Sequence, residues 1–114
     1  MKRCYSLKRN KEFKRVYRIG KSQGSHLLVL IHAKSKDDSV HIGLSVSKKL
    51  GNSVKRNRIK RRLRAALTPF LPLIKEKTNI IFIAREPVKD AEFSEITKSI
   101  DKLLKKASLL KQND

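Results

Sequence analysis

The chain has 114 residues, and its 29 Lys or Arg against 10 Asp or Glu give a formal net charge of +19. With 39% hydrophobic residues it is too apolar for a disordered basic tail, and its single cysteine excludes a secreted scaffold held by internal disulfides. No apolar run reaches membrane-spanning length and none near the start resembles a signal peptide, so we expect a soluble, cytoplasmic protein that does not bind a membrane. The high positive charge predicts a polyanionic partner.

The first predicted element is a short helix. Asn10 can cap it, and Gly20 lies just past its expected end. Phe13, Val16 and Tyr17 share one face at the i, i+3, i+4 spacing of a helix. Such a stripe most often belongs to a core, but two aromatic side chains near many N-terminal cations also suit stacking on unpaired bases.

Two strands follow, joined by the turn-like sequence KSKDDS. Residues 26–34 predict a strand that is apolar on both faces, and residues 40–47 predict a strand with strict alternation. One face of the second strand is apolar. Its other face is small and polar, and consists of His41, Gly43, Ser45 and Ser47.

A basic helix is the next element. The sequence VKRNRIKRRLR, residues 54–64, holds seven cations and no acid, and Asn52 or Ser53 can cap the helix that it predicts. At 100° per residue the apolar side chains form one stripe, made of Ile59, Leu63, Ala66, Leu67 and Phe70. The opposite side presents Asn57, Arg58, Arg61 and Arg64, with Lys55, Lys60 and Arg62 on the flanks.

A buried strand at residues 79–85 and a long amphipathic helix from Phe93 to Leu110 complete the order α-β-β-α-β-α. The length suits one α+β domain over residues 1–114, with flexible tails at 1–6 and 111–114. We expect the helices to pack on one face of the sheet, which would leave the small polar strand face open.

The charge is unevenly distributed along the chain. Residues 1–75 hold 21 Lys or Arg against three acids, whereas residues 76–114 hold eight against seven. Cations that serve only solubility are usually interspersed with acidic residues. Here no acidic residue stands between Asp38 and Glu76. Arg fills most outward positions of the basic helix, and its planar guanidinium pairs with phosphate and stacks on bases. The pattern favours a nucleic-acid-binding face over a solvated one.

The sequence offers no set of residues for catalysis by the protein itself. His26 and His32 would lie about 20 Å apart by strand rise, too far to share a metal ion, and His41 falls on the next strand. Cys4 has no CxxC partner. We therefore expect no catalytic residue, no metal site and no cofactor on this chain.

The segment GLSVSKKLGNSVKRNRIKRRLRAAL closely resembles the signature of the protein subunit of bacterial ribonuclease P. The matching residues are Gly43, Val46, Lys48, Lys49, Gly51, Asn52, Arg56, Asn57, Arg58, Lys60, Arg61 and Arg64. FKRVYRIGKS resembles the first helix of the family, and IIFIARE with Pro87 resembles its third strand, so the likeness extends from about Leu7 to Leu110. Ala65 stands where the family often has Glu, Ile31 where an aromatic residue is common, and Arg62 where an apolar residue is usual.

The resemblance implies a fold like the second domain of ribosomal protein S5, with a mixed sheet and a left-handed βαβ crossover. It also implies a ribonucleoprotein endonuclease, a hydrolase that removes the 5′ leader from precursor tRNA. In that enzyme a catalytic RNA would carry out the cleavage and the holoenzyme would require Mg2+. This chain would be its RNA-binding subunit, without an obligate protein partner.

The resemblance also implies two sites. Contact with the RNA subunit would fall to Lys48, Lys49, Asn52, Lys55, Arg56, Asn57, Arg58, Lys60, Arg61 and Arg64. A cleft between the sheet and the first helix would receive the single-stranded leader, through Phe13, Tyr17, Ser45, Ser47 and Lys48.

Two other functions are compatible with the composition. One is a free-standing RNA chaperone or ribosomal protein, which composition alone does not separate from a ribonuclease P subunit. The other is a basic helix lying on a membrane surface. The apolar stripe at residues 59–70 lacks Trp and is interrupted by Pro69, which argues against the membrane.

Overall fold

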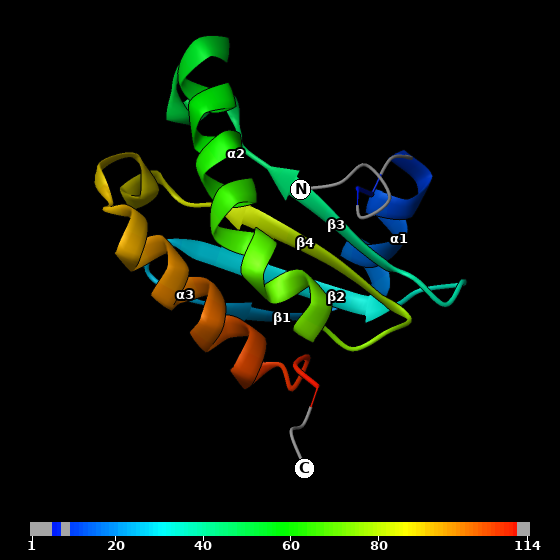
Figure 1. The fold of residues 1–114 in the computed structure, drawn as a ribbon. Coiled ribbons are helices and arrows are strands. Elements are labelled where there is room, and N and C mark those ends of the chain that lie inside the picture. Colours follow the sequence, from blue (N-terminus) through cyan, green and yellow to red (C-terminus); the bar gives the residue numbers. More distant parts are fainter. Residues whose placement is uncertain (1–5, 8–9, 112–114) are drawn as a thin grey trace.

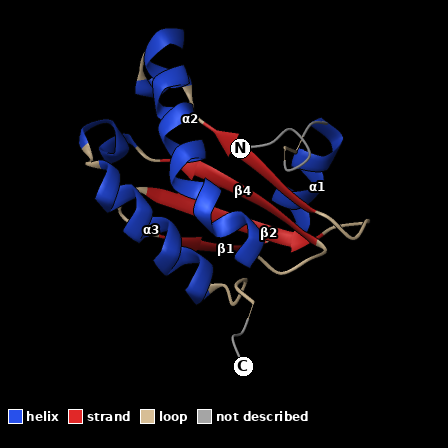
Figure 2. Cartoon of the chain, in the orientation of Figure 1, coloured by secondary structure: helices blue, strands red, loops and turns tan. Residues whose placement is uncertain are grey.

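The computed structural model describes residues 6, 7 and 10–111, and within them the chain forms an α+β domain (Figures 1 and 2). The helices are α1 (Asn10–Ile19), α2 (Ser53–Leu67) and α3 (Phe93–Lys106). The strands are β1 (Lys21–Gly24), β2 (Leu28–Lys34), β3 (Val40–Ser45) and β4 (Thr78–Ala84). Short 3-10 turns occupy Lys48–Leu50, Thr68–Leu73 and Glu86–Asp90. The α+β class predicted from the sequence is confirmed.

The strands form one mixed sheet in the order β1-β2-β4-β3. β2 pairs antiparallel with both β1 and β4, whereas β3 and β4 are parallel. The strand predicted at residues 26–34 begins at Leu28. β1 was not predicted, because its sequence KSQG has no apolar alternation and it exists only by pairing with the free edge of β2.

The crossover connection from β3 through α2 to β4 has the less common of the two possible handednesses. Viewed from the α2 side with both parallel strands pointing up, β4 lies to the left of β3 (Figure 1), so the crossover is left-handed. About 98% of such connections are right-handed. The left-handed crossover implied by the family resemblance is therefore confirmed.

α2 and α3 lie side by side in front of the sheet (Figure 1) and bury the main core against it. Leu63 and Leu67 of α2 and Ile100 of α3 are fully buried there, together with Ile80 and Phe82 of β4. The apolar stripe predicted on the basic helix is thus the anchor of α2 to the sheet.

α1 packs on the opposite face of the sheet, so the prediction that all helices share one face is wrong. Val16 of α1 joins Leu7, Ala33 and Ile81 in a second apolar cluster, with Phe13 packed against it. The reason lies in β2 and β4, which are apolar on both faces and therefore need cover on both sides.

The expected flexible tails lie mostly outside the described residues. Two tail residues are described and both contact the domain. Ser6 forms a β-bridge with Ile42, next to the hydrogen bond from the Leu7 N–H to the Ile42 carbonyl at 3.0 Å, and the Lys111 N–H donates to the Leu73 carbonyl at 2.7 Å. The flexibility of residues 1–6 and 111–114 stays a prediction. Among the described residues, no helix has the length and apolarity to cross a membrane.

Candidate nucleic-acid interface

The basic helix α2 begins at an N-cap, as the sequence predicts. The Asn52 side chain accepts a hydrogen bond from the Lys55 N–H at 3.0 Å, which satisfies one of the donors that a helix start leaves free. Gly51, just before the cap, has a φ of 128°, a conformation that side chains other than glycine rarely adopt. The Gly-Asn pair thus fixes where α2 leaves the 3-10 turn that carries Lys48 and Lys49.

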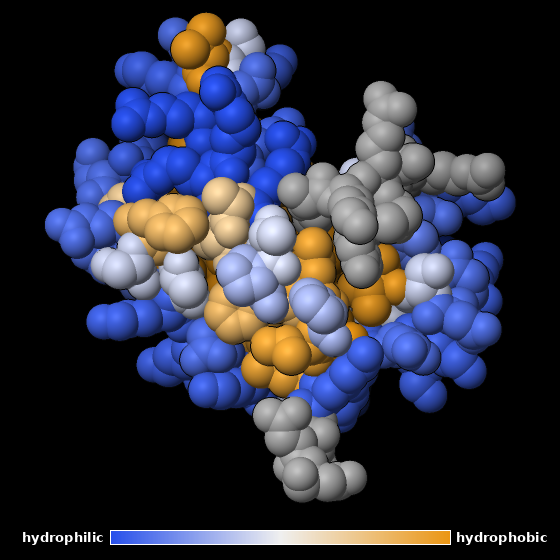
Figure 3. All heavy atoms as spheres, in the orientation of Figure 1, coloured by the Kyte–Doolittle hydropathy of each residue, from blue (hydrophilic) through white to orange (hydrophobic). Residues whose placement is uncertain are grey.

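The outward side of α2 is an exposed row of cations. Asn57, Arg58, Arg61 and Arg64 are exposed, and Lys60 and Arg62 on the flanks are half-buried, as the 100° spacing predicts. Figure 3 shows a band of strongly hydrophilic side chains over the upper part of α2, below a hydrophobic group at its very end. In the described part of the chain no α2 cation forms an ion pair, although four other pairs are present. An exposed helix without compensating acids is stabilised when an anion meets it.

Arg56 and Arg62 differ from the exposed cations. The Nε atom of Arg56 is buried and has no hydrogen-bond partner among the described residues, which leaves a strong donor unused. Arg62 donates to the Ala91 carbonyl at 2.6 Å and so ties α2 to the segment before α3. Arg62 therefore serves the fold, whereas the Nε donor of Arg56 has no use among the described residues.

A hollow of about 460 Å³ follows the start of α2 on one flank. Lys49, Lys55 and Arg58 border it, and Lys89 and Asp90 close it from the turn before α3. Lys48 and Lys49 are both exposed. With Arg62, which also lines it, the structure therefore gathers five cations and one carboxylate around one depression, an arrangement that suits a chain of phosphates.

On the other flank of α2 a smaller hollow, of about 170 Å³, lies between α2, α1 and β3. We call it the α1–α2 hollow. Phe13 and Gly43 line it together with Lys60 and Arg64. The family resemblance implies that Phe13 contacts the leader and that the two cations contact the RNA subunit, but the structure brings all three to one place. Such an arrangement can hold a base on an aromatic ring and its phosphate on a cation.

The other predicted leader residues do not line this hollow. Tyr17, one turn beyond Phe13 on α1, is 45% exposed. Ser45 ends β3 and is half-buried, while Ser47 and Lys48 are exposed just beyond it. Leu7 also lines the hollow, and sequence reasoning missed it because no periodic element contains it.

The histidines do not form a site together. His26 is exposed before β2, His32 is half-buried opposite Lys21, and His41 contacts Asp37 with Nε2 at 3.0 Å from a carboxylate oxygen. Among residues 6, 7 and 10–111, no group of three His, Cys, Asp or Glu could hold a metal ion. Cys4 lies outside the described residues.

Comparisons with known proteins agree with this geometry. The model of the Ribonuclease P family matches residues 1–108. The ribonuclease P protein component of Clostridium novyi (strain NT) is 44% identical over 111 residues, which cover 96% of this chain and 98% of that protein. That of Oceanobacillus iheyensis is 45% identical over 113 residues, 97% of this chain and 93% of that protein.

Solved structures give the same result. The structure of Staphylococcus aureus RNase P protein at 2.0 Å is 38% identical, with a TM-score of 0.85 over 94% of this chain and 98% of that one. The RNase P protein from Thermotoga maritima, 24% identical with a TM-score of 0.78 over 87% of this chain and 96% of that one, supports the fold. Because these matches span nearly the whole chain, this protein belongs to the Ribonuclease P family.

Proposed function

We propose that this subunit of ribonuclease P binds the catalytic RNA through α2 and guides the 5′ leader of precursor tRNA past α1. The observation that carries the proposal is the cation row of α2, which is anchored by a buried apolar stripe and lacks compensating acids within the described residues. A helix of this kind is held rigidly by the core while its charge is left for a polyanion.

Binding to the RNA subunit is proposed to use the outward cations and the turn before them. Arg58, Arg61 and Arg64 are exposed, and the half-buried Arg56 adds a fourth guanidinium group on the same helix. Each phosphate that a cation neutralises releases condensed counterions, which supplies much of the affinity. Lys48, Lys49, Asn52, Lys55, Asn57 and Lys60 complete the proposed surface.

The leader is proposed to enter the α1–α2 hollow. Phe13 is half-buried there and Tyr17 is more exposed, so Tyr17 presents the more accessible ring to an unpaired base. Lys60 and Arg64 supply positive charge for the leader phosphates. Ser45, Ser47 and Lys48, at the end of β3, would contact the strand as it leaves the hollow.

The cleavage itself is assigned to the RNA of the holoenzyme, with Mg2+ as its metal ion. The protein contributes indirectly, because holding the leader raises substrate affinity and cationic side chains lower the repulsion between RNA segments. A free-standing RNA chaperone is the competing function.

Reconstitution tests the proposal. The full chain is mixed with a bacterial ribonuclease P RNA at low Mg2+, and 5′ cleavage of a precursor tRNA is followed against RNA alone and protein alone. We expect efficient cleavage only by the mixture. A chain that binds RNA but does not raise cleavage above that of RNA alone would instead fit the chaperone function, and cleavage by the protein alone would contradict catalysis by the RNA.

A further inference from the structure

A third hollow lies on the other flank of α1, against the loop that joins β2 to β3. Its volume is about 480 Å³, compared with about 170 Å³ for the α1–α2 hollow. Lys11 and Arg15 border it from α1, and at 100° per residue they lie on the side of the helix opposite Phe13 and Tyr17. We call it the α1–loop hollow. It shares no lining residue with the proposed leader site.

Asn79 of β4 lies at this hollow and is only 4% exposed. Its Oδ1 atom is buried and has no hydrogen-bond partner among the described residues. Its backbone is aligned with Ala33 of β2 on one side and His41 of β3 on the other. A buried carbonyl oxygen without a donor destabilises a fold, and an apolar side chain would avoid that cost. Because Asn79 lines the hollow, a turn of its side-chain amide would present this unused acceptor to a ligand that brings an N–H or O–H group.

The rim of the α1–loop hollow is positively charged. Five cations line it against the two carboxylates of Glu12 and Asp37, and the cations are Lys11, Lys14, Arg15, Arg18 and Lys36. Apart from that of Arg15, which donates to the Lys34 carbonyl at 2.9 Å, their side chains have no hydrogen bond or ion pair to a described residue. An anionic group is thus favoured at the rim.

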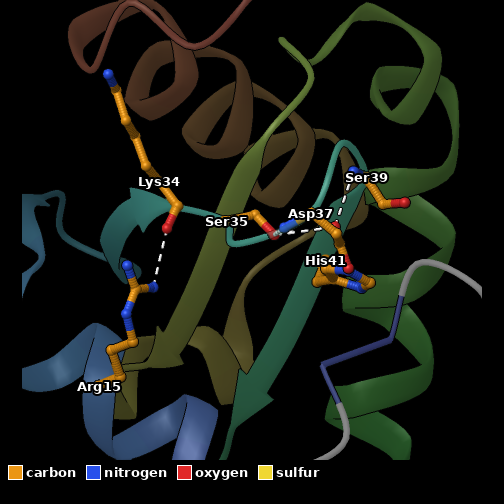
Figure 4. A network of polar contacts seen from close by, with 6 residues as sticks. All are labelled: Arg15, Lys34, Ser35, Asp37, Ser39 and His41. Carbon is orange, nitrogen blue, oxygen red and sulfur yellow. Dashed lines mark hydrogen bonds and ion pairs between the residues drawn. The ribbon is translucent and has the colours of Figure 1, made fainter.

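Asp37, one of the two rim carboxylates, also shapes the loop (Figure 4). Its carboxylate accepts hydrogen bonds from the Ser39 N–H at 2.9 Å and the Ser35 hydroxyl at 3.0 Å, and it contacts His41 Nε2. The Ser39 N–H, and then His41, hold the pKa of Asp37 below its ordinary value, so this carboxylate stays ionised with partners of its own. The loop therefore has a fixed shape around the hollow.

We propose that the α1–loop hollow binds an unpaired nucleotide, whose base donates an N–H to Asn79 Oδ1 and whose phosphate lies among the rim cations. A bare phosphate would satisfy the rim but leave the buried acceptor unpaired. The volume falls within the range of about 300–1,000 Å³ that small-molecule sites occupy. This inference rests on the proposed RNA-binding function, and it adds a nucleotide site that is separate from the leader hollow.

The test uses the free full chain labelled with 15N. Amide spectra are recorded during titration with 5′-AMP, with ribose 5-phosphate and with inorganic phosphate at low salt. We expect AMP to shift the side-chain amide signals of Asn79 and to bind roughly 5-fold more tightly than ribose 5-phosphate, because only the base reaches the acceptor. Equal affinity for the two, or an Asn79 amide that AMP leaves unshifted, would overturn the proposal.

Two variants refine the test. Asn79→Leu removes the acceptor at similar volume, so the melting temperature should hold or rise while AMP affinity falls to that of ribose 5-phosphate. The pair Lys14→Gln and Lys36→Gln should weaken all three ligands, whereas the matched pair Lys98→Gln and Lys102→Gln on α3 should weaken them less. If Asn79→Leu fails to fold, the wild-type comparison of AMP with ribose 5-phosphate still decides the proposal.

The source of the nucleotide is decided by competition. If a single-stranded RNA tetranucleotide displaces AMP, the site binds an unpaired RNA residue. If the tetranucleotide does not displace AMP, the site binds a free nucleotide. An acidic peptide that shifts Asn79 as AMP does would overturn recognition of a base. Failure of AMP to bind, with binding of the RNA subunit intact, would overturn this site alone and leave the proposed function standing.

Discussion

The ring of Phe13 on α1 lies directly over Gly43 on β3. A β-carbon built on Gly43 would lie 2.5 Å from Phe13 Cζ and 2.6 Å from its Cε1, closer than real β-carbons approach other atoms. The Phe13 ring thus packs directly against the Gly43 backbone, and the absence of a side chain at Gly43 sets the depth of the α1–α2 hollow. The same glycine belongs to the segment by which the chain resembles its family.

Gly43→Ala should therefore displace the Phe13 ring. Overpacking of this kind typically costs about 1–3 kcal/mol, so we expect a lower melting temperature and weaker binding of precursor tRNA by the holoenzyme. Thermal unfolding and substrate affinity measure the two effects. In a Phe13→Leu background the added methyl should cost less, and a cost that is the same in both backgrounds would contradict the contact.

Tyr17→Ala should weaken holoenzyme binding to precursor tRNA but not to mature tRNA, which lacks the leader. Stacking of a base on an aromatic ring is worth about 1–3 kcal/mol, so we expect a loss of roughly 5- to 150-fold for the precursor. Tyr17→Phe should retain most of the affinity, and Ile19→Ala, at another exposed position of α1, serves as the control. Equal losses for both tRNAs would mean that Tyr17 supports the fold instead.

Arg58, Arg61 and Arg64 changed together to Ala should leave the fold intact, because the apolar stripe of α2 is untouched. Affinity for the RNA subunit should fall, and the slope of log K against log salt should flatten by about 0.7–0.9 per lost phosphate contact. The matched control removes three exposed lysines from α3: Lys98, Lys102 and Lys106. A control with the same loss of slope would show that net charge, and not α2, governs binding.

The stability of the protein should depend on pH through His32. Burial first, and the charge of Lys21 second, lower the pKa of His32, whose ordinary value is about 6.5. The unfolded chain then binds the proton more readily than the folded one, so stability is full above about pH 6.5 and declines as the pH falls toward the folded pKa. Denaturant unfolding from pH 8 to pH 5 measures this decline.

His32→Gln should reduce that decline, and His26→Gln, which removes an exposed imidazole before β2, is the control. A titration of the His32 ring by NMR gives its pKa directly. A midpoint at or above 6.5 would contradict the lowered pKa.

The sequence determined the local elements and the chemistry of α2. The stripe from Ile59 to Phe70 and the Asn52 cap depend on neighbours within a few residues, so spacing alone predicts them. The cation row follows from the same periodicity, and the family resemblance rests on these residues. The alternation of apolar and polar residues in β3 likewise places Ile42 and Gly43 on opposite faces of the strand without knowledge of the fold.

Only the tertiary structure decided which face each helix covers and which distant residues meet. Periodicity shows that Val16 of α1 is buried, but it does not show against which side of the sheet, since β2 and β4 are apolar on both faces. β1 carries no pattern of its own and forms because β2 presents a free edge. The meeting of Phe13 with Lys60 and Arg64, and the unpaired Asn79 at the α1–loop hollow, arise from pairing between segments far apart in the chain. Such contacts depend on the packing of the whole domain, which local spacing does not encode.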